Sequence, residues 1–333
     1  MNNNDVKEKI LPIGGQAVLE GVMMRSPDKV ATAVRKPDGE IVMKIEEYKG
    51  ISEKHKWLNI PFIRGAVTLI EVMILGIRHL NFSADVAIKA EDEEKKKKGE
   101  KVKEQKKSSG NIGVIFSVVF ALGVGMALFF AFPLWVTTHL FNIEKDAMTF
   151  NFLAGSIRLT LFLVYIIAIS FMKDIKRLFQ YHGAEHMAVF AFESKDELTV
   201  ENTKRFSTFH PRCGTSFLVM VMLVSVIFFS FLDTFTIYLL GDINFTIRLL
   251  THLPFVGLVG GISYEIIRLS AKKIDNPFVK LLITPGLWLQ RITTKNPDDD
   301  MLEVAICALK AARGEDISKF LKKEEPETEL IEQ

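Results

Sequence analysis

Four long apolar stretches in the middle of this 333-residue chain decide what it can fold into. A bilayer hydrocarbon core about 30 Å thick is crossed by roughly 20 mainly apolar helical residues. The stretches reach that length, and they run from Ile112 to Leu134, Phe152 to Met172, Phe217 to Leu240 and Phe245 to Leu269. Buried core helices of a soluble protein are the alternative, but four of this length in succession are rare there. We therefore predict a mainly α, polytopic membrane protein with four transmembrane helices.

Lysine and arginine gather on one side of these predicted spans. Nine lysines lie from Lys89 to Lys107, and seven Lys or Arg residues lie in the connection 173–214. The two other connections hold one lysine between them, Lys145. Because basic residues are retained in cytoplasmic loops, both termini and the long middle loop are predicted to face the cytoplasm.

The soluble segments divide the rest of the chain. We expect an N-terminal cytoplasmic unit over 1–88, a charged linker over 89–110, the transmembrane domain over 111–270 with its cytoplasmic loop 173–214, and an interfacial and amphipathic C-terminal region over 271–333. The N-terminal unit is predicted to contain β structure. Val30 to Val34 and Ile41 to Ile45 alternate apolar and polar residues around a Lys-Pro-Asp-Gly turn, which predicts a hairpin.

Two further segments are apolar but shorter or interrupted. Pro61 to Leu80 contains four charged or titratable residues, and a charge at mid-bilayer costs about 3 kcal/mol. We interpret it as an amphipathic helix in the cytoplasmic unit or at the interface; a fifth span, which would place the N-terminus outside, is the alternative. Near the C-terminus, Phe278 to Trp288 is predicted to be interfacial, and Pro297 to Ala312 to form an amphipathic helix.

The middle loop contains the most informative motif, Tyr-His-Gly-Ala-Glu-His, with His182, Glu185 and His186. On a helix continuing from the second span, positions i, i+3 and i+4 share one face. Two imidazoles four residues apart can bind a divalent metal, with Glu185 as general base or third ligand. The alternative is a pair of interfacial histidines, one of them hydrogen-bonded to Glu185.

A second cluster, Phe-His-Pro-Arg-Cys-Gly, precedes the third span and adds His210 and Cys213. The membrane would bring both ends of the loop together, so these donors are predicted to complete the coordination of His182 and His186. A thiolate ligand favours zinc over manganese or magnesium. For Cys213, a buried role beside Gly214 remains the alternative.

Other charged residues are weaker candidates. Glu20 and Arg25 are either paired within a strand or form a wall of the site, and Glu265 and Arg268 either pair with each other or reach the site. Asp233 and Arg248 are expected to snorkel towards the opposite membrane surface. The remaining histidines are interpreted as isolated and structural: His55, His79, His139 and His252.

Charge and cysteine content limit the partners and the compartment. The 42 Lys and Arg residues nearly balance the 40 Asp and Glu residues, a net charge of +2 that does not indicate nucleic-acid binding. Two cysteines, Cys213 and Cys307, suit a reducing compartment. The expected partners are the lipid bilayer, a membrane-associated substrate and, in a homo-oligomer, further copies of this chain.

Four long motifs in order resemble the YqhQ family of bacterial membrane proteins. They are Gly-Gly-Gln-Ala-Val-Leu-Glu-Gly-Val-Met-Met-Arg from Gly14, Tyr-His-Gly-Ala-Glu-His, His-Pro-Arg-Cys-Gly-Thr and Gln-Arg-Ile-Thr-Thr-Lys-Asn-Pro-Asp from Gln290. The resemblance implies a multi-pass protein of the bacterial cytoplasmic membrane and a metal-dependent enzyme, and it brings no reaction or substrate with it.

Three functions are compatible with these features. The first is a cytoplasm-facing divalent-metal site that hydrolyses a membrane-associated substrate, with zinc held by His182, His186, His210 and Cys213 and with Glu185 as base. The second is a non-catalytic membrane scaffold or regulator with a structural metal or none. A transporter is a weaker third hypothesis, because four spans without an evident repeat offer little machinery.

Overall fold

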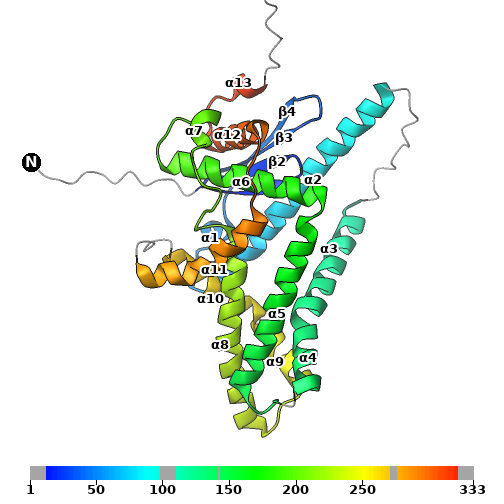
Figure 1. The fold of residues 1–333 in the computed structure, drawn as a ribbon, viewed down its shortest axis with the longest axis vertical. Helices are drawn as coiled ribbons and strands as arrows, with labels where there is room; N and C mark the ends of the chain where they lie inside the picture. Colours follow the sequence, from blue (N-terminus) through cyan, green and yellow to red (C-terminus); the bar gives the residue numbers. More distant parts are fainter. Residues whose placement is uncertain (1–12, 98–109, 142, 271–275, 322–333) are drawn as a thin grey trace, which may run out of the picture.

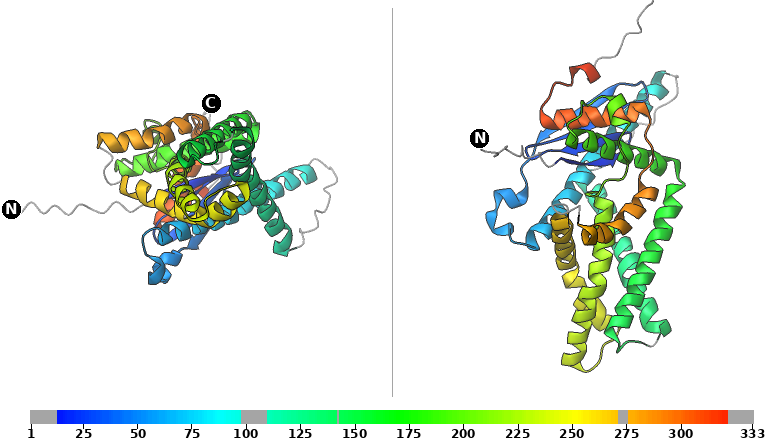
Figure 2. Two further views of the ribbon diagram at one scale, coloured as in Figure 1. Left: turned by 90° about the horizontal axis from the view of Figure 1, so that it is seen from below. Right: turned by 60° about the vertical axis from the view of Figure 1, so that its left-hand side comes forward.

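The protein has two parts, which Figure 1 shows one above the other. The computed structural model describes residues 13–97, 110–141, 143–270 and 276–321. A small sheet with helices on both faces forms the upper part, called here the head domain, and long apolar helices extend below it (Figures 1 and 2). The predicted fold class, mainly helical with a small N-terminal β unit, is confirmed.

The sheet is an antiparallel meander in the order β1-β2-β3-β4. Its strands are β1 (Gly14–Val18), β2 (Gly21–Arg25), β3 (Lys29–Arg35) and β4 (Ile41–Glu47). The pairing of β3 with β4 runs from Arg35 opposite Ile41 to Lys29 opposite Glu47, which confirms the predicted hairpin. Gly39 takes φ 86° in the turn, a conformation that glycine adopts without strain.

Helices pack on both faces of the sheet because its strands are apolar on both sides. The covering helices are α2 (Ile63–Lys97), α6 (Lys173–Glu193) and α12 (Asp299–Arg313). Side chains alternate between the faces along a strand. Val22 and Met24 of β2 join a core with α6 and α12, whereas Met23 joins a second core with Leu75 of α2. The head is therefore a three-layer unit with the sheet in the middle.

The α12 helix confirms the predicted C-terminal helix but is more buried than an amphipathic helix would be. Leu302, Ala305 and Leu309 are among its side chains in the main core, and Cys307 is fully buried, which raises the pKa of its thiol to about 12. This core joins the N-terminal sheet, α6 from the middle loop and α12 from the C-terminal region. Segments far apart in the sequence thus form one head domain.

In the part of the chain that the structure describes, four candidate spans are long and apolar enough to cross a membrane, and they lie below the head. They are α3 (Gly110–Met126) with a π-helical turn (Ala127–Ala131) and α4 (Phe132–Phe141); α5 (Ala147–Ser170); α8 (Gly214–Leu240); and α9 (Phe245–His252) with a 3-10 turn (Leu253–Phe255) and α10 (Val256–Ser270). The first continues past Leu134 to Phe141, and the other three agree closely with the predicted stretches. Gly155 allows α5 and α8 to approach closely, because a Cβ there would lie 2.4 Å from Val226 Cγ2.

Shorter elements complete the description. They are α1 (Ile51–Lys54), a 3-10 helix (Lys56–Leu58), α7 (Val200–Thr203), α11 (Pro277–Thr293) and α13 (Ser318–Leu321). In Figures 1 and 2, α11 lies near the junction between the spans and the head. Exposed apolar side chains such as Phe278 and Trp288 lie along it.

Two predicted boundaries differ from the structure. The middle-loop helix does not continue directly from the second span: α5 ends at Ser170, Met172 is extended, and α6 begins at Lys173 and lies across the top of α5 (Figure 1). The predicted linker 89–110 is helical through Lys97, where an i,i+4 pair of Lys95 with Glu91 supports the helix. The rest of that linker up to residue 109, and the predicted tail 322–333, lie outside the described residues.

The expectation that Asp233 and Arg248 snorkel is wrong. Both are fully buried, and Asp233 accepts hydrogen bonds from Arg248 Nε at 2.9 Å, His252 Nε2 at 2.7 Å and Asn151 Nδ2 at 2.7 Å. His252 is therefore not isolated. The ion pair and hydrogen bonds inside the helical bundle stabilise the two charges, which would otherwise need contact with water at the membrane surface.

His79 is not isolated either. It is fully buried between α2 and the sheet, with Nδ1 2.7 Å from Thr32 Oγ1. Burial is the main cause that lowers the pKa of His79; Lys44 and Arg78 act in the same direction, and Glu46 opposes them. The neutral imidazole is the form that fits this position.

Candidate metal centre

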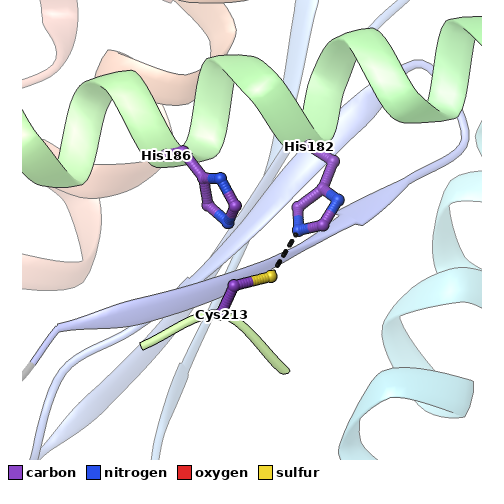
Figure 3. A group of neighbouring side chains, drawn as sticks. All are labelled: His182, His186 and Cys213. Carbon is purple, nitrogen blue, oxygen red and sulfur yellow. Dashed lines mark hydrogen bonds between the residues drawn. The ribbon is translucent and has the colours of Figure 1, made fainter. Parts of the chain in front are cut away.

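Helix α6 places His182 and His186 side by side. They lie four residues apart on one helical face, and their ring centroids are 4.4 Å apart (Figure 3). Gly183 lies between them, and a Cβ there would lie 2.1 Å from the carbonyl oxygen of Lys295. The glycine that weakens the helix in isolation is therefore needed for close packing of α6 on the segment after α11.

Backbone carbonyls fix the orientation of both rings. His182 Nδ1 lies 2.8 Å from the carbonyl oxygen of Thr293, and His186 Nδ1 bonds in the same way to the carbonyl oxygen of Thr208. A carbonyl only accepts, so each Nδ1 carries the proton and each Nε2 keeps a free lone pair. Histidines that bind metals are commonly held in this way.

Cys213 supplies a third donor from another element. It is the N-cap residue of α8, and its Sγ lies 3.2 Å from His182 Nε2 (Figure 3). The start of a helix stabilises negative charge, which suits a thiolate. One donor atom each from His182, His186 and Cys213 lies within 4.8 Å of the others. The structure thus brings together two predicted ligands from α6 and one from the loop 210–214, which is called here the return loop.

Glu185 lies beside these donors. Its Oε2 is 3.6 Å from His186 Nε2, and the residue is 6% exposed. Within the residues that the structure describes, no lysine or arginine forms an ion pair with it. Gly15 of β1 packs directly against its side chain, because a Cβ there would lie 2.8 Å from Glu185 Cγ. The Gly-Gly motif therefore closes the site from the sheet side.

His210 is not part of the three-donor group. Its Nδ1 accepts a hydrogen bond from the backbone N–H of Arg212 at 3.2 Å, so in the neutral ring the proton lies on Nε2. That Nε2 is buried and has no hydrogen-bond partner among the described residues. Burial lowers the pKa of His210, and Glu185 opposes this shift only in part. His210 Nε2 lies 3.6 Å from Glu193 Oε2, so His210 lines the cavity without joining the three converging donors, and its predicted role as a ligand stays a prediction.

Gln290 of α11 positions the return loop, a role that sequence reasoning missed. The side chain is fully buried; Oε1 accepts from the His210 N–H at 2.8 Å, and Nε2 donates to the His210 carbonyl at 2.8 Å and to Ser216 Oγ at 3.1 Å. The motif that begins at Gln290 supports the family resemblance, but nothing local in it indicates these contacts.

The other predicted site residues lie apart from the histidines. Glu20 pairs with the Arg177 guanidinium of α6, so the interpretation as a Glu20–Arg25 pair is wrong. Arg25 instead lies 4.2 Å from the centroid of the Tyr48 ring. Glu265 accepts two hydrogen bonds of 2.6 Å from Arg64, whereas the Arg268 guanidinium is 4.0 Å from its carboxylate.

A cavity of about 100 Å³ lies against the three donors, several times the space that one water molecule needs. Its walls are α6, the start of β1 and the return loop 210–214. Two oriented imidazoles, a cysteine and a carboxylate thus surround a space that can hold an ion and a small reacting group.

Comparison with known proteins gives the chain a family. Residues 60–315 match a family described as protein of unknown function (DUF1385). A relative from Bacillus subtilis (strain 168), "Uncharacterized protein YqhQ", is 36% identical over 315 residues, which cover 90% of this chain and 92% of the relative. No solved structure matches the chain. The resemblance noted from the four motifs is confirmed: the chain is similar to YqhQ over nearly its whole length, and it belongs to the DUF1385 family.

Proposed function

We propose that this protein binds a divalent metal ion, with zinc favoured, at the cytoplasmic surface of the bacterial cytoplasmic membrane and uses it to hydrolyse a membrane-associated substrate. The observation that carries the proposal is the convergence of His182, His186 and Cys213 donors within 4.8 Å, with the Nδ1 atoms of both imidazoles bonded to backbone carbonyls and His182 Nε2 directed at Cys213 Sγ. Nitrogen and sulfur donors of this kind suit zinc.

The charge of the site supports a cation. Glu185 is nearly buried beside the two imidazoles, 3.6 Å from His186 Nε2, and no lysine or arginine of the described residues pairs with it. A buried carboxylate without a positive partner is costly. A divalent ion would supply that missing charge and stabilise the thiolate form of Cys213.

Three protein ligands with space beside them are typical of catalytic zinc sites, which keep one coordination position for water. A bound zinc ion would lower the pKa of such a water molecule and polarise a scissile group. Glu185, 3.6 Å from His186 Nε2, would accept the proton of the attacking water, and His210 would line the site with its Nε2 near Glu193.

A structural metal in a membrane scaffold is the second candidate. Two donors come from α6 and the third from the start of α8, so an ion there would fasten the head domain to a candidate span. With Glu185 as a fourth ligand, the coordination shell would be closed.

Cobalt substitution separates the two candidates without a known substrate. Co²⁺-loaded protein should show a thiolate-to-cobalt charge-transfer band that Cys213→Ser removes. If one position is open, added acetohydroxamate should change the d–d spectrum, and Glu185→Gln should retain cobalt. A thiolate band together with a d–d spectrum that acetohydroxamate does not change would favour the scaffold. The absence of a thiolate-to-cobalt band in the wild type would contradict both candidates.

The orientation rests on the distribution of Lys and Arg. It predicts that a cysteine at Lys195, in the middle loop, is protected from a membrane-impermeant maleimide in intact cells, whereas a cysteine at Lys145 is labelled. Both positions are exposed and the native cysteines are buried, which keeps the background low. Labelling of Lys195→Cys from outside would overturn the cytoplasmic placement.

A further inference from the structure

A second, larger cavity adjoins the candidate metal centre. It has a volume of about 590 Å³, within the range of roughly 300–1,000 Å³ that is usual for ligand pockets. It shares part of its wall with the smaller cavity, including Gly14, Gly15, Cys213 and Gly214. We call this space the amphiphile chamber, for the ligand inferred below.

The walls of the chamber are mainly apolar. Leu69, Val72 and Leu75 of α2 form one wall, and Phe217 of α8 and Ile267 of α10 contribute from the ends of two candidate spans. The chamber therefore lies where the spanning helices meet the head domain. Such a wall is suited to an acyl or prenyl chain rather than to a small polar metabolite.

Among the described residues, the charged side chains that line the chamber are all basic, with no Asp or Glu: Arg25, Arg212 and Arg268. Arg25 has no ion pair with an acidic residue among those described. Arg212 pairs with Glu193, and Arg268 is 4.0 Å from a Glu265 carboxylate that Arg64 already binds with two hydrogen bonds. The positive charge at this wall is thus incompletely balanced, which favours an anionic group, above all phosphate.

Apolar surface also lies outside the chamber. On α2, Ile70 is 54% and Ile74 50% exposed, on the helical face opposite to Val72 of the chamber wall, and Trp288 of α11 is 62% exposed. Exposed aliphatic side chains and tryptophan at the ends of spanning helices are typical of the bilayer interface. The outer face of α2, the helix that forms one wall of the chamber, therefore suits the bilayer interface.

We infer that the amphiphile chamber binds a phosphate-headed lipid amphiphile, with the phosphate at Arg25 and Arg268 and the start of the chain along α2. That such a molecule is also the substrate rests on the function proposed above, since the shared wall at Cys213 and Gly15 would bring its head group next to the metal donors.

Native mass spectrometry of the full-length, EDTA-treated protein in a nonionic detergent tests the inference. The probes are oleoyl lysophosphatidic acid, the zwitterionic oleoyl lysophosphatidylcholine and inorganic phosphate. We expect one lysophosphatidic acid to be retained per chain, at least about tenfold more tightly than lysophosphatidylcholine, because charge-assisted bonds to phosphate are strong. Inorganic phosphate at equal concentration should not displace it, because the chain contributes affinity. Equal retention of both lipids, or displacement by phosphate, would overturn the inference.

Variants locate the binding. Arg25→Gln/Arg268→Gln should weaken lysophosphatidic acid about tenfold or more, and Val72→Trp, which fills the chamber, should weaken both lipids. Arg291→Gln is the matched control, because Arg291 is an exposed arginine of α11 outside the chamber lining. Thermal melting confirms that each variant is folded. An equal loss in the control, or none in the two chamber variants, would assign the binding to the surface and contradict the chamber.

Metal and lipid binding are measured separately. Because the probe is tested without metal, lipid binding by a protein that never binds metal would refute the proposed function and leave the chamber ligand intact. Metal binding without selective lipid retention would refute the chamber ligand and leave the proposed function intact.

Discussion

Two clusters of buried polar side chains lie at different levels of this molecule, and they are built differently. In the spans, Asp233 accepts bonds from three donors, Arg248 balances its charge, and neither residue lines either of the two cavities described above. In the candidate metal centre, Glu185 has no lysine or arginine partner among the described residues, and His182 and His186 line a cavity.

The difference separates a structural cluster from a candidate functional one. Charges in a membrane interior mark function by default, but the Asp233 cluster balances its own charge and fastens α5, α8 and α9 together. In the candidate metal centre, by contrast, Glu185 has no lysine or arginine partner among the described residues at a place where three donors converge. A buried polar residue is thus a better indication of function when the surrounding protein leaves its hydrogen bonds or its charge without a partner.

The largest effect is expected from Asp233→Ala. It leaves Arg248 buried without its carboxylate, and breaking a buried pair costs about 3–5 kcal/mol. Thermal or denaturant unfolding in detergent should show this loss, while the metal content of the folded fraction is unchanged. Asp242→Ala, at an exposed acid near the same end of α8, is the control. A loss of stability no greater than that of the control would contradict a structural role for the cluster.

Gly183→Ala should affect the metal centre through packing. The added methyl group would collide with the Lys295 carbonyl, and overpacking of this kind costs roughly 1–3 kcal/mol. Because α6 must move away, metal occupancy should fall together with stability. Gly123→Ala is a matched control in α3 with no atom within 4 Å of its Cβ, and there alanine should be neutral or stabilise by roughly 0.5–1 kcal/mol. Equal behaviour of the two variants would refute the packing argument.

Gln290→Ala tests how strongly the return loop depends on α11. Loss of its three hydrogen bonds should loosen His210 and Cys213 and weaken metal binding about 10–100-fold, measured by competition with a chelator. Gln180→Ala, which removes a single exposed hydrogen bond, should leave the affinity unchanged. An unchanged affinity in Gln290→Ala would show that the centre is positioned without α11.

The smallest expected effect is a pH dependence of the head domain through His79. Burial lowers the pKa of His79 in the folded protein, so folding favours the neutral ring. Its contribution to stability is complete above a pH of about 6.5 and is lost as the pH falls from there through the lowered pKa. Unfolding at a series of pH values should show a smaller acid loss for His79→Gln than for the wild type, whereas exposed His55→Gln should behave as the wild type does.

Sequence alone could predict what depends on local pattern. The four spans, the hairpin around Gly39 and the shared helical face of His182 and His186 follow from periodicity and spacing. It could not show that Gly183 packs on Lys295 or that Gln290 holds His210, because these partners are about 80 or more residues away. The prediction for Asp233 was wrong for a different reason: Arg248 and His252 lie only 15 and 19 residues away, but the sequence does not show that the next helix folds back so that both reach Asp233.

The length of α2 was missed for another reason. A run rich in lysine and acidic residues looks like a linker by composition, yet Lys95 and Glu91 have the spacing that supports a helix. Composition and helical spacing gave opposite indications, and spacing prevailed as far as Lys97.

The metal content of the purified protein tests the central claim most directly. Elemental analysis of wild type, His182→Ala/His186→Ala and the exposed control His139→Ala should find about one zinc ion per chain in the wild type and the control, and close to none in the double variant. Undiminished zinc in a folded double variant, or no divalent metal in any of the three after growth with zinc, would contradict the metal centre.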